Sequence, residues 1–169
     1  GALEAVGHKC LTLPTSNGKI TAEQVDTLIQ NHYNDASAEH TVQPGIVYIS
    51  FPTESGTLYS KQELTELYAV CQTHNIPLFI DGARLGYGLM SKNNDVTFED
   101  IANLCDVFYI GGTKVGALFG EAVVIPCASL QRDFRYLIKQ RGGLLAKGRL
   151  LGIQFETLLS EGLYFDISR

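Results

Sequence analysis

Charged and hydroxyl side chains follow two apolar stretches of the sequence, each at the point where a buried strand would end. Asp81 and Arg84 follow the residues LFI (78–80), and Thr113 and Lys114 follow the glycine pair of VFYIGGTK. Ligands of open parallel sheets bind outside the carboxyl ends of the strands. An acid, a guanidinium, a hydroxyl and an amine are therefore expected to meet at one edge of a sheet.

Each of these residues also has an ordinary structural interpretation. Asp81 and the glycine after it form a common turn pair, and Arg84 would then be a surface partner of Asp81. A lysine in a glycine-rich loop, as Lys114 is, more often lies in solvent than in a site. The joint placement of these groups at the ends of two neighbouring strands favours a shared site.

Pyridoxal 5'-phosphate chemistry uses this set of residues. The cofactor needs a lysine for a Schiff base and an acid beside its pyridine nitrogen. The acid keeps that nitrogen protonated, so that the ring accepts the electron pair released at the Cα atom of the substrate. Desolvation and nearby positive charge favour the deprotonated, nucleophilic form of the lysine. An arginine near the acid binds a carboxylate through two parallel hydrogen bonds, as an amino acid substrate requires.

Other site motifs are absent from the sequence. The glycines and lysine of GGTKVGALFG do not match the phosphate-loop pattern GxxxxGK[ST], and Gly82, Gly86 and Gly88 do not have the GxGxxG spacing. Neither HExxH nor GxSxG occurs, and the four histidines have no ligand spacing. No metal site is predicted.

The elements that must position the candidate site alternate between strand and helix. Short apolar, β-branched runs predict buried strands, and apolar residues at helical spacing predict the helices. The expected strands are 45–51, 78–81, 107–112 and 121–126. Residues 16–30 are expected to form a turn at Asn17–Gly18 and then a helix capped by Thr21, and further helices are expected over 60–74, 97–104, 128–140 and 144–160. Residues 31–44 are expected to form a polar loop. This order predicts an α/β fold with a mostly parallel sheet and right-handed crossovers.

Composition narrows the class of protein. The chain has 169 residues, 45% of them hydrophobic, which is enough for one domain with a core. A net charge of −5 without a basic stripe argues against nucleic acid as a partner, and no apolar segment reaches the ~18 residues of a membrane span. The four cysteines, at 10, 71, 105 and 127, are expected to be buried free thiols of a reduced, cytoplasmic compartment.

Two segments together resemble a known family. FIDGARLGYGL, followed by YIGGTKVGALFGEAVVIP, is similar to the threonine aldolase and β-eliminating lyase group of fold-type-I pyridoxal-phosphate enzymes. FPTESGTLYSKQELTELYAVCQTHNIPLFIDGAR and RGGLLAKGRLLGIQFETLL also resemble segments of this group, so the likeness covers nearly the whole chain. It implies a three-layer αβα arrangement. Residues 1–143 would form the central and C-terminal part of the cofactor-binding large domain, and 144–169 a long helix leading toward a small C-terminal domain.

The resemblance also implies roles for individual residues. Lys114 would form the Schiff base with the cofactor, and Asp81 would pair with the pyridine nitrogen. Thr113 would lie near the cofactor phosphate, and Thr53 lies on a loop that approaches the cofactor in this family. Arg84 would bind the substrate carboxylate.

The sequence departs from the family pattern at several points. Family members often carry Asn-Thr-His-Asn where this chain has Pro-Thr-Glu-Ser at 52–55, so an amide and an imidazole expected near the site are absent. The family's phosphate loop and ring-stacking residue would lie upstream of Gly1, and a second carboxylate-binding arginine beyond Arg169. We therefore expect the chain to be part of a longer protein.

The resemblance implies a lyase that cleaves a β-hydroxy-α-amino acid, such as threonine or allo-threonine, into glycine and an aldehyde. It also implies a homo-oligomer, a dimer or a tetramer. Two alternatives stay open. One is β-elimination from an aromatic or sulfur amino acid on the same cofactor. The other is an inactive fragment that binds no cofactor by itself.

Overall fold

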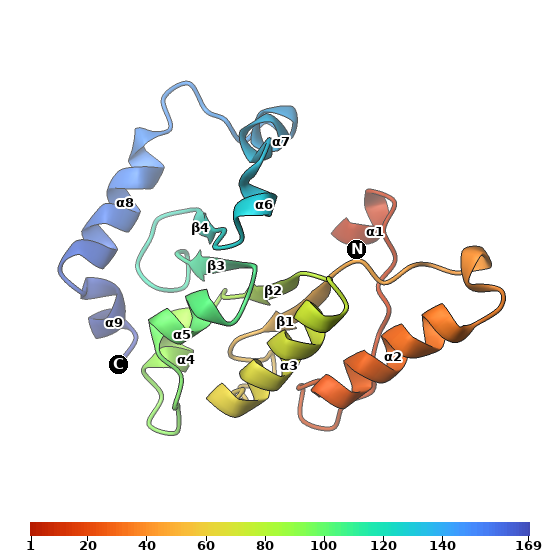
Figure 1. The fold of residues 1–169 in the computed structure, drawn as a ribbon. Coiled ribbons are helices and arrows are strands. Elements are labelled where there is room, and N and C mark those ends of the chain that lie inside the picture. Colours follow the sequence, from red (N-terminus) through yellow and green to blue (C-terminus); the bar gives the residue numbers. More distant parts are fainter.

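A computed structural model describes all of residues 1–169, and its centre is a four-stranded mixed sheet in the order β1-β2-β3-β4 (Figure 1). The strands are β1 (Val47–Ser50), β2 (Leu78–Asp81), β3 (Val107–Gly111) and β4 (Glu121–Val124). Strands β1, β2 and β3 are parallel, whereas β4 runs antiparallel to β3. The expected α/β class with a mostly parallel sheet is confirmed.

Helices connect and flank the strands. The three longest are α2 (Ala22–Asn34), α3 (Lys61–Thr73) and α8 (Arg149–Ser160). The shorter ones are α1 (Ala2–Ala5), the 3₁₀ helix η1 (Ala38–His40), α4 (Leu85–Leu89), α5 (Phe98–Asn103), α6 (Ala128–Gln131), α7 (Phe134–Gln140) and α9 (Leu163–Ile167). None of them combines the length and the apolar character needed to cross a bilayer.

Capping boxes fix where the crossover helices begin. At the start of α3, the Ser60 hydroxyl accepts a hydrogen bond from the Glu63 N–H, and the Glu63 carboxylate accepts one from the Ser60 N–H. Lys19 also donates to Glu63, at 2.6 Å, which ties the N-terminal segment to this helix start. The same reciprocal pattern caps α2 at Thr21 and α5 at Thr97. Two otherwise unpaired N–H groups are satisfied at each start.

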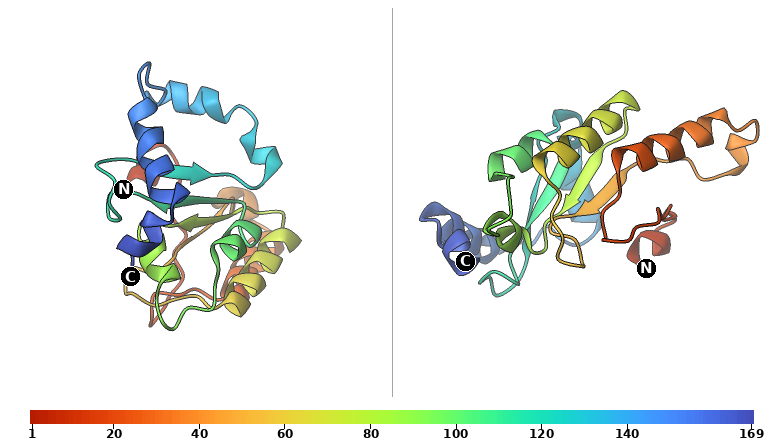
Figure 2. Two further views of the ribbon diagram at one scale, coloured as in Figure 1. Left: turned by 90° about the vertical axis from the view of Figure 1, so that its left-hand side faces the viewer. Right: turned by 90° about the horizontal axis from the view of Figure 1, so that it is seen from below.

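The hydrophobic core lies between one face of the sheet and the helices α2, α3 and α5, which gather on that face (Figure 2). Side chains alternate along each strand, so every second residue points into the core. The core-facing strand residues are Val47, Ile49, Leu78, Ile80, Phe108 and Ile110. Leu64, Leu67 and Cys71 of α3 and Ile101 of α5 pack against them. We call the opposite face, which carries Tyr48, Phe79, Asp81 and Tyr109, the open face.

Three segments of the sequence-based prediction are wrong. The predicted helix 128–140 is instead the two helices α6 and α7, interrupted at Asp133, whose φ is +60°. The predicted loop 31–44 contains the last turn of α2 and all of η1, because His32 on α2 and Thr41 after η1 are joined by a hydrogen bond of 3.1 Å that keeps this polar segment folded. The predicted helix 144–160 begins only at Arg149, after Gly148, and the long helix expected over 144–169 is instead the two helices α8 and α9.

Helix α4 was not predicted, because its sequence LGYGL is rich in glycine. These glycines serve packing. A Cβ atom at Gly86 would lie 2.1 Å from the Ser168 hydroxyl, and one at Gly88 would lie 2.9 Å from Pro52. The N–H of Gly86 also donates to the buried Tyr164 hydroxyl of α9, at 3.1 Å. The glycines therefore let α4 approach its neighbours closely.

The cysteine prediction is correct for two of the four residues. Cys71 and Cys105 are buried free thiols, and burial raises the pKa of each to about 12. Cys127 is only half-buried, and Cys10 is exposed, which the apolar context of its sequence did not indicate.

Leu64 is fully buried under the sheet, and we expect Leu64→Ala to lower the free energy of unfolding by about 2–5 kcal/mol because it leaves a cavity. Leu137→Ala on α7 is the matched control, since this leucine is 52% exposed. Urea unfolding followed by circular dichroism measures both. A loss at Leu64 no larger than that at Leu137 would contradict this description of the core.

Candidate active site

The ends of β2 and β3 touch each other through their backbones. The Gly111 N–H donates to the Gly82 carbonyl at 2.9 Å. A Cβ atom at Gly82 would lie 2.0 Å from the carbonyl oxygen of Tyr109, and one at Gly111 would lie 2.3 Å from that of Ala83. Both positions therefore require glycine. The Asp-Gly pair is thus a close contact between neighbouring strand ends, and not only a turn.

Asp81 ends β2 on the open face and accepts three hydrogen bonds. The Tyr48 hydroxyl of β1 donates to Oδ2, and the Tyr109 hydroxyl of β3 donates to Oδ1. The Ala83 N–H also donates to Oδ1, at 3.0 Å. The carboxylate is therefore held from both neighbouring strands and from its own turn.

These contacts keep Asp81 ionised. Partial burial raises the pKa of the carboxyl, but the hydrogen bonds from Tyr109, Tyr48 and Ala83, with attraction from Lys114, outweigh burial and lower it below its usual range. Burial and the nearby carboxylate raise the pKa of both phenols, so they remain protonated donors. An ionised acid in a partly desolvated place is what a cationic or N–H-bearing ligand needs.

Lys114 lies in the loop between β3 and β4, which we call the lysine loop (112–120). Its side-chain amine is exposed and makes no hydrogen bond or ion pair. The backbone around it is held, because its carbonyl accepts a hydrogen bond of 2.6 Å from the Tyr87 hydroxyl and the next residue, Val115, is fully buried. The amine is thus free to react while its attachment point is fixed.

Thr113 faces Glu121, the first residue of β4. Its hydroxyl donates to Glu121 Oε1 at 3.2 Å, and the Gly112 N–H donates to Glu121 Oε2 at 2.6 Å. Glu121 therefore closes the base of the lysine loop. The predicted contact of Thr113 with a phosphate stays a prediction, and it would require the hydroxyl to exchange this partner.

Thr53 is buried and uses its hydroxyl within its own loop. The hydroxyl lies 2.6 Å from the Thr57 hydroxyl and accepts a hydrogen bond of 3.1 Å from the Thr57 N–H. Thr53 also lines a hollow of about 190 Å³, together with Tyr48 and Glu54. Its loop thus borders the open face, while its hydroxyl has a local structural role.

Arg84 pairs with Glu54 and not with Asp81, and its predicted role in binding a substrate carboxylate stays a prediction. Its Nη1 donates to Glu54 Oε1 at 3.1 Å. The Glu54 side chain is 77% exposed and that of Arg84 is 38% exposed, so water surrounds much of the pair. An exposed ion pair of this kind is worth little, and another carboxylate can replace Glu54.

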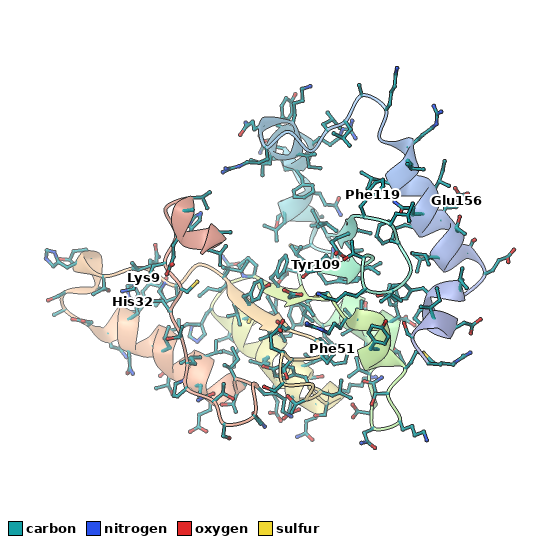
Figure 3. The ribbon with its side chains drawn as sticks, turned by 180° about the vertical axis from the view of Figure 1, so that it is seen from behind. Lys9, His32, Phe51, Tyr109, Phe119 and Glu156 are labelled. Atoms are coloured by element: carbon teal, nitrogen blue, oxygen red, sulfur yellow. The ribbon has the colours of Figure 1, made fainter.

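Tyr48, Tyr109 and Glu121 complete the site, and sequence reasoning missed them. The signal for the tyrosines was the alternation of strand residues: Tyr48 and Tyr109 point away from the core in otherwise apolar strands, on the same face as Asp81. Tyr109 is labelled on the sheet in Figure 3. The partnership of Glu121 with the lysine loop depends on β4 turning back antiparallel to β3, which the sequence pattern did not predict.

A mostly parallel α/β sheet with an ionised acid and an unpaired lysine after neighbouring strands suits a pyridoxal-phosphate enzyme. A family model described as "Beta-eliminating lyase" matches residues 1–154. The chain therefore belongs to the β-eliminating lyase family.

Known relatives agree with this assignment. A low specificity L-threonine aldolase of a Pseudomonas species is 32% identical over 94% of the chain and 44% of its own length. A threonine aldolase structure from Leishmania major superimposes with a TM-score of 0.92 and is 49% identical, covering 99% of this chain and 48% of that one. An L-allo-threonine aldolase structure from Listeria monocytogenes, described as putative, shares the fold at a TM-score of 0.65 and 20% identity, over 92% of this chain and 41% of its own. The chain spans about half the length of these relatives.

Enzymes of this family use pyridoxal 5'-phosphate. The residues described above fit its ring, because Asp81 offers an ionised acceptor to a ring N–H and Lys114 offers an unpaired amine at the same sheet edge. No group of three or more His, Cys, Asp or Glu side chains lies close enough to hold a metal ion.

Gly82→Ala tests the contact between the strand ends. We expect it to lower the free energy of unfolding by about 1–3 kcal/mol or more, because the new methyl group overlaps the Tyr109 carbonyl oxygen. Gly45→Ala is the matched control, since no atom lies within 4 Å of the Cβ position there. Urea unfolding compares the two variants, and equal stabilities would show that the strand ends do not need this glycine.

Proposed function

We propose that this chain is part of a pyridoxal-phosphate-dependent aldolase that cleaves a β-hydroxy-α-amino acid, threonine or allo-threonine, into glycine and an aldehyde. What supports the proposal is that the ionised Asp81 and the unpaired Lys114 follow the neighbouring strands β2 and β3, with Lys114 near enough to help lower the pKa of the acid. Similarity to threonine aldolases over more than nine tenths of the chain supports the choice of reaction.

When bound, the cofactor supplies an electron-accepting ring that stabilises the negative charge left at the substrate Cα when the Cα–Cβ bond breaks. Asp81 accepts the hydrogen bond of the ring N–H and, as an anion, keeps the proton on that nitrogen. Lys114 holds the cofactor through its amine. The held backbone on either side of Lys114 limits where that amine can reach.

Arg84 binds the substrate carboxylate in this proposal. The guanidinium exchanges Glu54 for the substrate, which forms two parallel hydrogen bonds where Glu54 forms one. Thr53 and Thr113 contribute at the cofactor: Thr53 through its loop beside the open face, and Thr113 through a hydroxyl that leaves Glu121 for the phosphate.

The proposed assembly is a cytoplasmic homo-oligomer, a dimer or a tetramer. Association is supported by exposed apolar side chains on the lysine loop, on α8 and on the residues just before α8. One of them is Leu118, which is 80% exposed. The others are Phe119, Leu144, Leu145, Leu150 and Ile153. In the longer protein, residues 1–143 belong to the large domain, and residues 144–169 lead toward a small C-terminal domain.

β-Elimination from an aromatic or sulfur amino acid is the second candidate, because the matching family model carries that name. It uses the same cofactor and the same Asp81 and Lys114. The products separate the two reactions: an aldehyde and glycine from the aldolase, ammonia and a keto acid from the eliminating lyase.

The full-length protein tests the aldolase directly. We expect it to release acetaldehyde from threonine, and borohydride to fix the cofactor on Lys114. Asp81→Ala should lower kcat by about 10²-fold or more while some cofactor is still fixed, because only the electron-accepting state of the ring is lost. The control for loss of a charge is Lys92→Ala, because Lys92 is an exposed lysine outside the site.

Two outcomes would contradict this proposal. Ammonia and pyruvate from a β-substituted amino acid, without aldehyde from threonine, would identify an eliminating lyase. Near-normal turnover by Asp81→Ala would remove the role given to the acid.

Residues 1–169 alone should bind pyridoxal phosphate weakly or not at all. Of these residues only Thr113 is proposed to reach the phosphate, and its hydroxyl must first leave Glu121. Absorbance titration with the cofactor, followed by borohydride and mass mapping, measures binding, with Lys114→Ala as the background. Stoichiometric fixation on Lys114 of the isolated chain would refute this expectation.

A further inference from the structure

An aromatic row crosses the open face beside Asp81. Tyr48 of β1 stacks on Phe79 of β2, with ring centroids 5.2 Å apart and planes 9° apart. Tyr109 of β3 packs on the other side of Phe79 at 6.1 Å, tilted by 51°. Phe79 separates the two tyrosine rings, and their hydroxyls converge on the carboxylate of Asp81, two residues further along β2.

The two phenols donate to different oxygens of the Asp81 carboxylate. Tyr48 donates to Oδ2, while Tyr109 and the Ala83 N–H donate to Oδ1. A carboxylate accepts about four hydrogen bonds, so one position remains, on Oδ2. Donors on both oxygens fix the rotation of the group and aim the remaining lone pair.

We propose that Tyr48 and Tyr109 are positioning residues that hold the Asp81 carboxylate as an anion, so that the proton between it and the cofactor ring stays on the ring nitrogen. This inference rests on the proposed function, in which Asp81 faces that nitrogen. A proton shared by two bases resides on the stronger one. Each phenol that donates to the carboxylate makes it a weaker base, and the nitrogen therefore keeps the proton.

The surrounding charges agree with this arrangement. Lys114 attracts the Asp81 carboxylate and helps to lower its pKa. Burial and then Asp81 raise the pKa of both tyrosines; Glu54 adds to the effect on Tyr48, and Tyr48 and Glu121 add to that on Tyr109. Arg84, the remaining charged group, is paired with Glu54. Both phenols thus stay protonated and able to donate at neutral pH, where the acid is ionised.

Tyr48→Phe, Tyr109→Phe and the double variant remove the donors and keep the rings, so the stacking on Phe79 is retained. In the full-length protein labelled with ¹³C at aspartate Cγ, the Asp81 signal is identified by its loss in Asp81→Asn. We expect Asp81 to titrate at a higher pH in each single variant and at a still higher pH in the double variant. Tyr33→Phe, a phenol on the surface of α2 that accepts a hydrogen bond from Gln43, should leave the titration unchanged. An unchanged Asp81 titration in the double variant would overturn the proposal.

The cofactor gives a second measurement. With ¹⁵N-labelled pyridoxal phosphate bound, the ring nitrogen should have the shift of a protonated pyridine in the parent protein and move toward the neutral shift in the double variant. We expect kcat to fall about tenfold or more, with KM changed less, because the phenols act through Asp81 and not on substrate binding. A cofactor ring nitrogen that stays fully protonated in the double variant would overturn the proposal. Absence of borohydride-fixed cofactor in the parent protein would instead refute the proposed function. The ¹³C titration would still test whether Tyr48 and Tyr109 hold Asp81 as an anion.

Discussion

The contact between the ends of β2 and β3 is the constraint on which the rest of the site depends. Gly82 and Gly111 bring two backbones together at a distance that no side chain permits. Asp81 directly precedes Gly82, and Lys114 closely follows Gly111. The main-chain contact therefore places the acid and the lysine on neighbouring strand ends. The surrounding side chains refine this arrangement: the tyrosines orient the acid, and Glu121 closes the lysine loop.

The sequence predicted those parts of the fold that depend on local rules. Ser60 and Glu63 predicted the start of α3 because a capping box acts within one turn of helix. The strand ending on Asp81 and the strand preceding Lys114 were predicted from short apolar runs. Helix α4 was missed because its glycines satisfy contacts with α9 and Pro52, which lie far away in the sequence.

The same distinction applies to the candidate site. Asp81, Arg84 and Lys114 were found because their residue types and their positions after strands are visible in the sequence. The hydrogen bonds of Tyr48 and Tyr109 to Asp81 depend on the pairing of three strands, and the bonds from Gly112 and Thr113 to Glu121 depend on the antiparallel return of β4. The side chains that tune the acid and the loop therefore had no local signature.

Strand β1 has a further consequence, since it lies at the margin of the sheet with β2 on one side only. Its residues VYIS carry no charge, and Tyr48 and the preceding Ile46 are 48% and 57% exposed. An uncharged strand of this kind, with unpaired N–H and C=O groups along one side, is a template for pairing with another chain. The same N–H and C=O groups offer a fifth strand a place to extend the sheet.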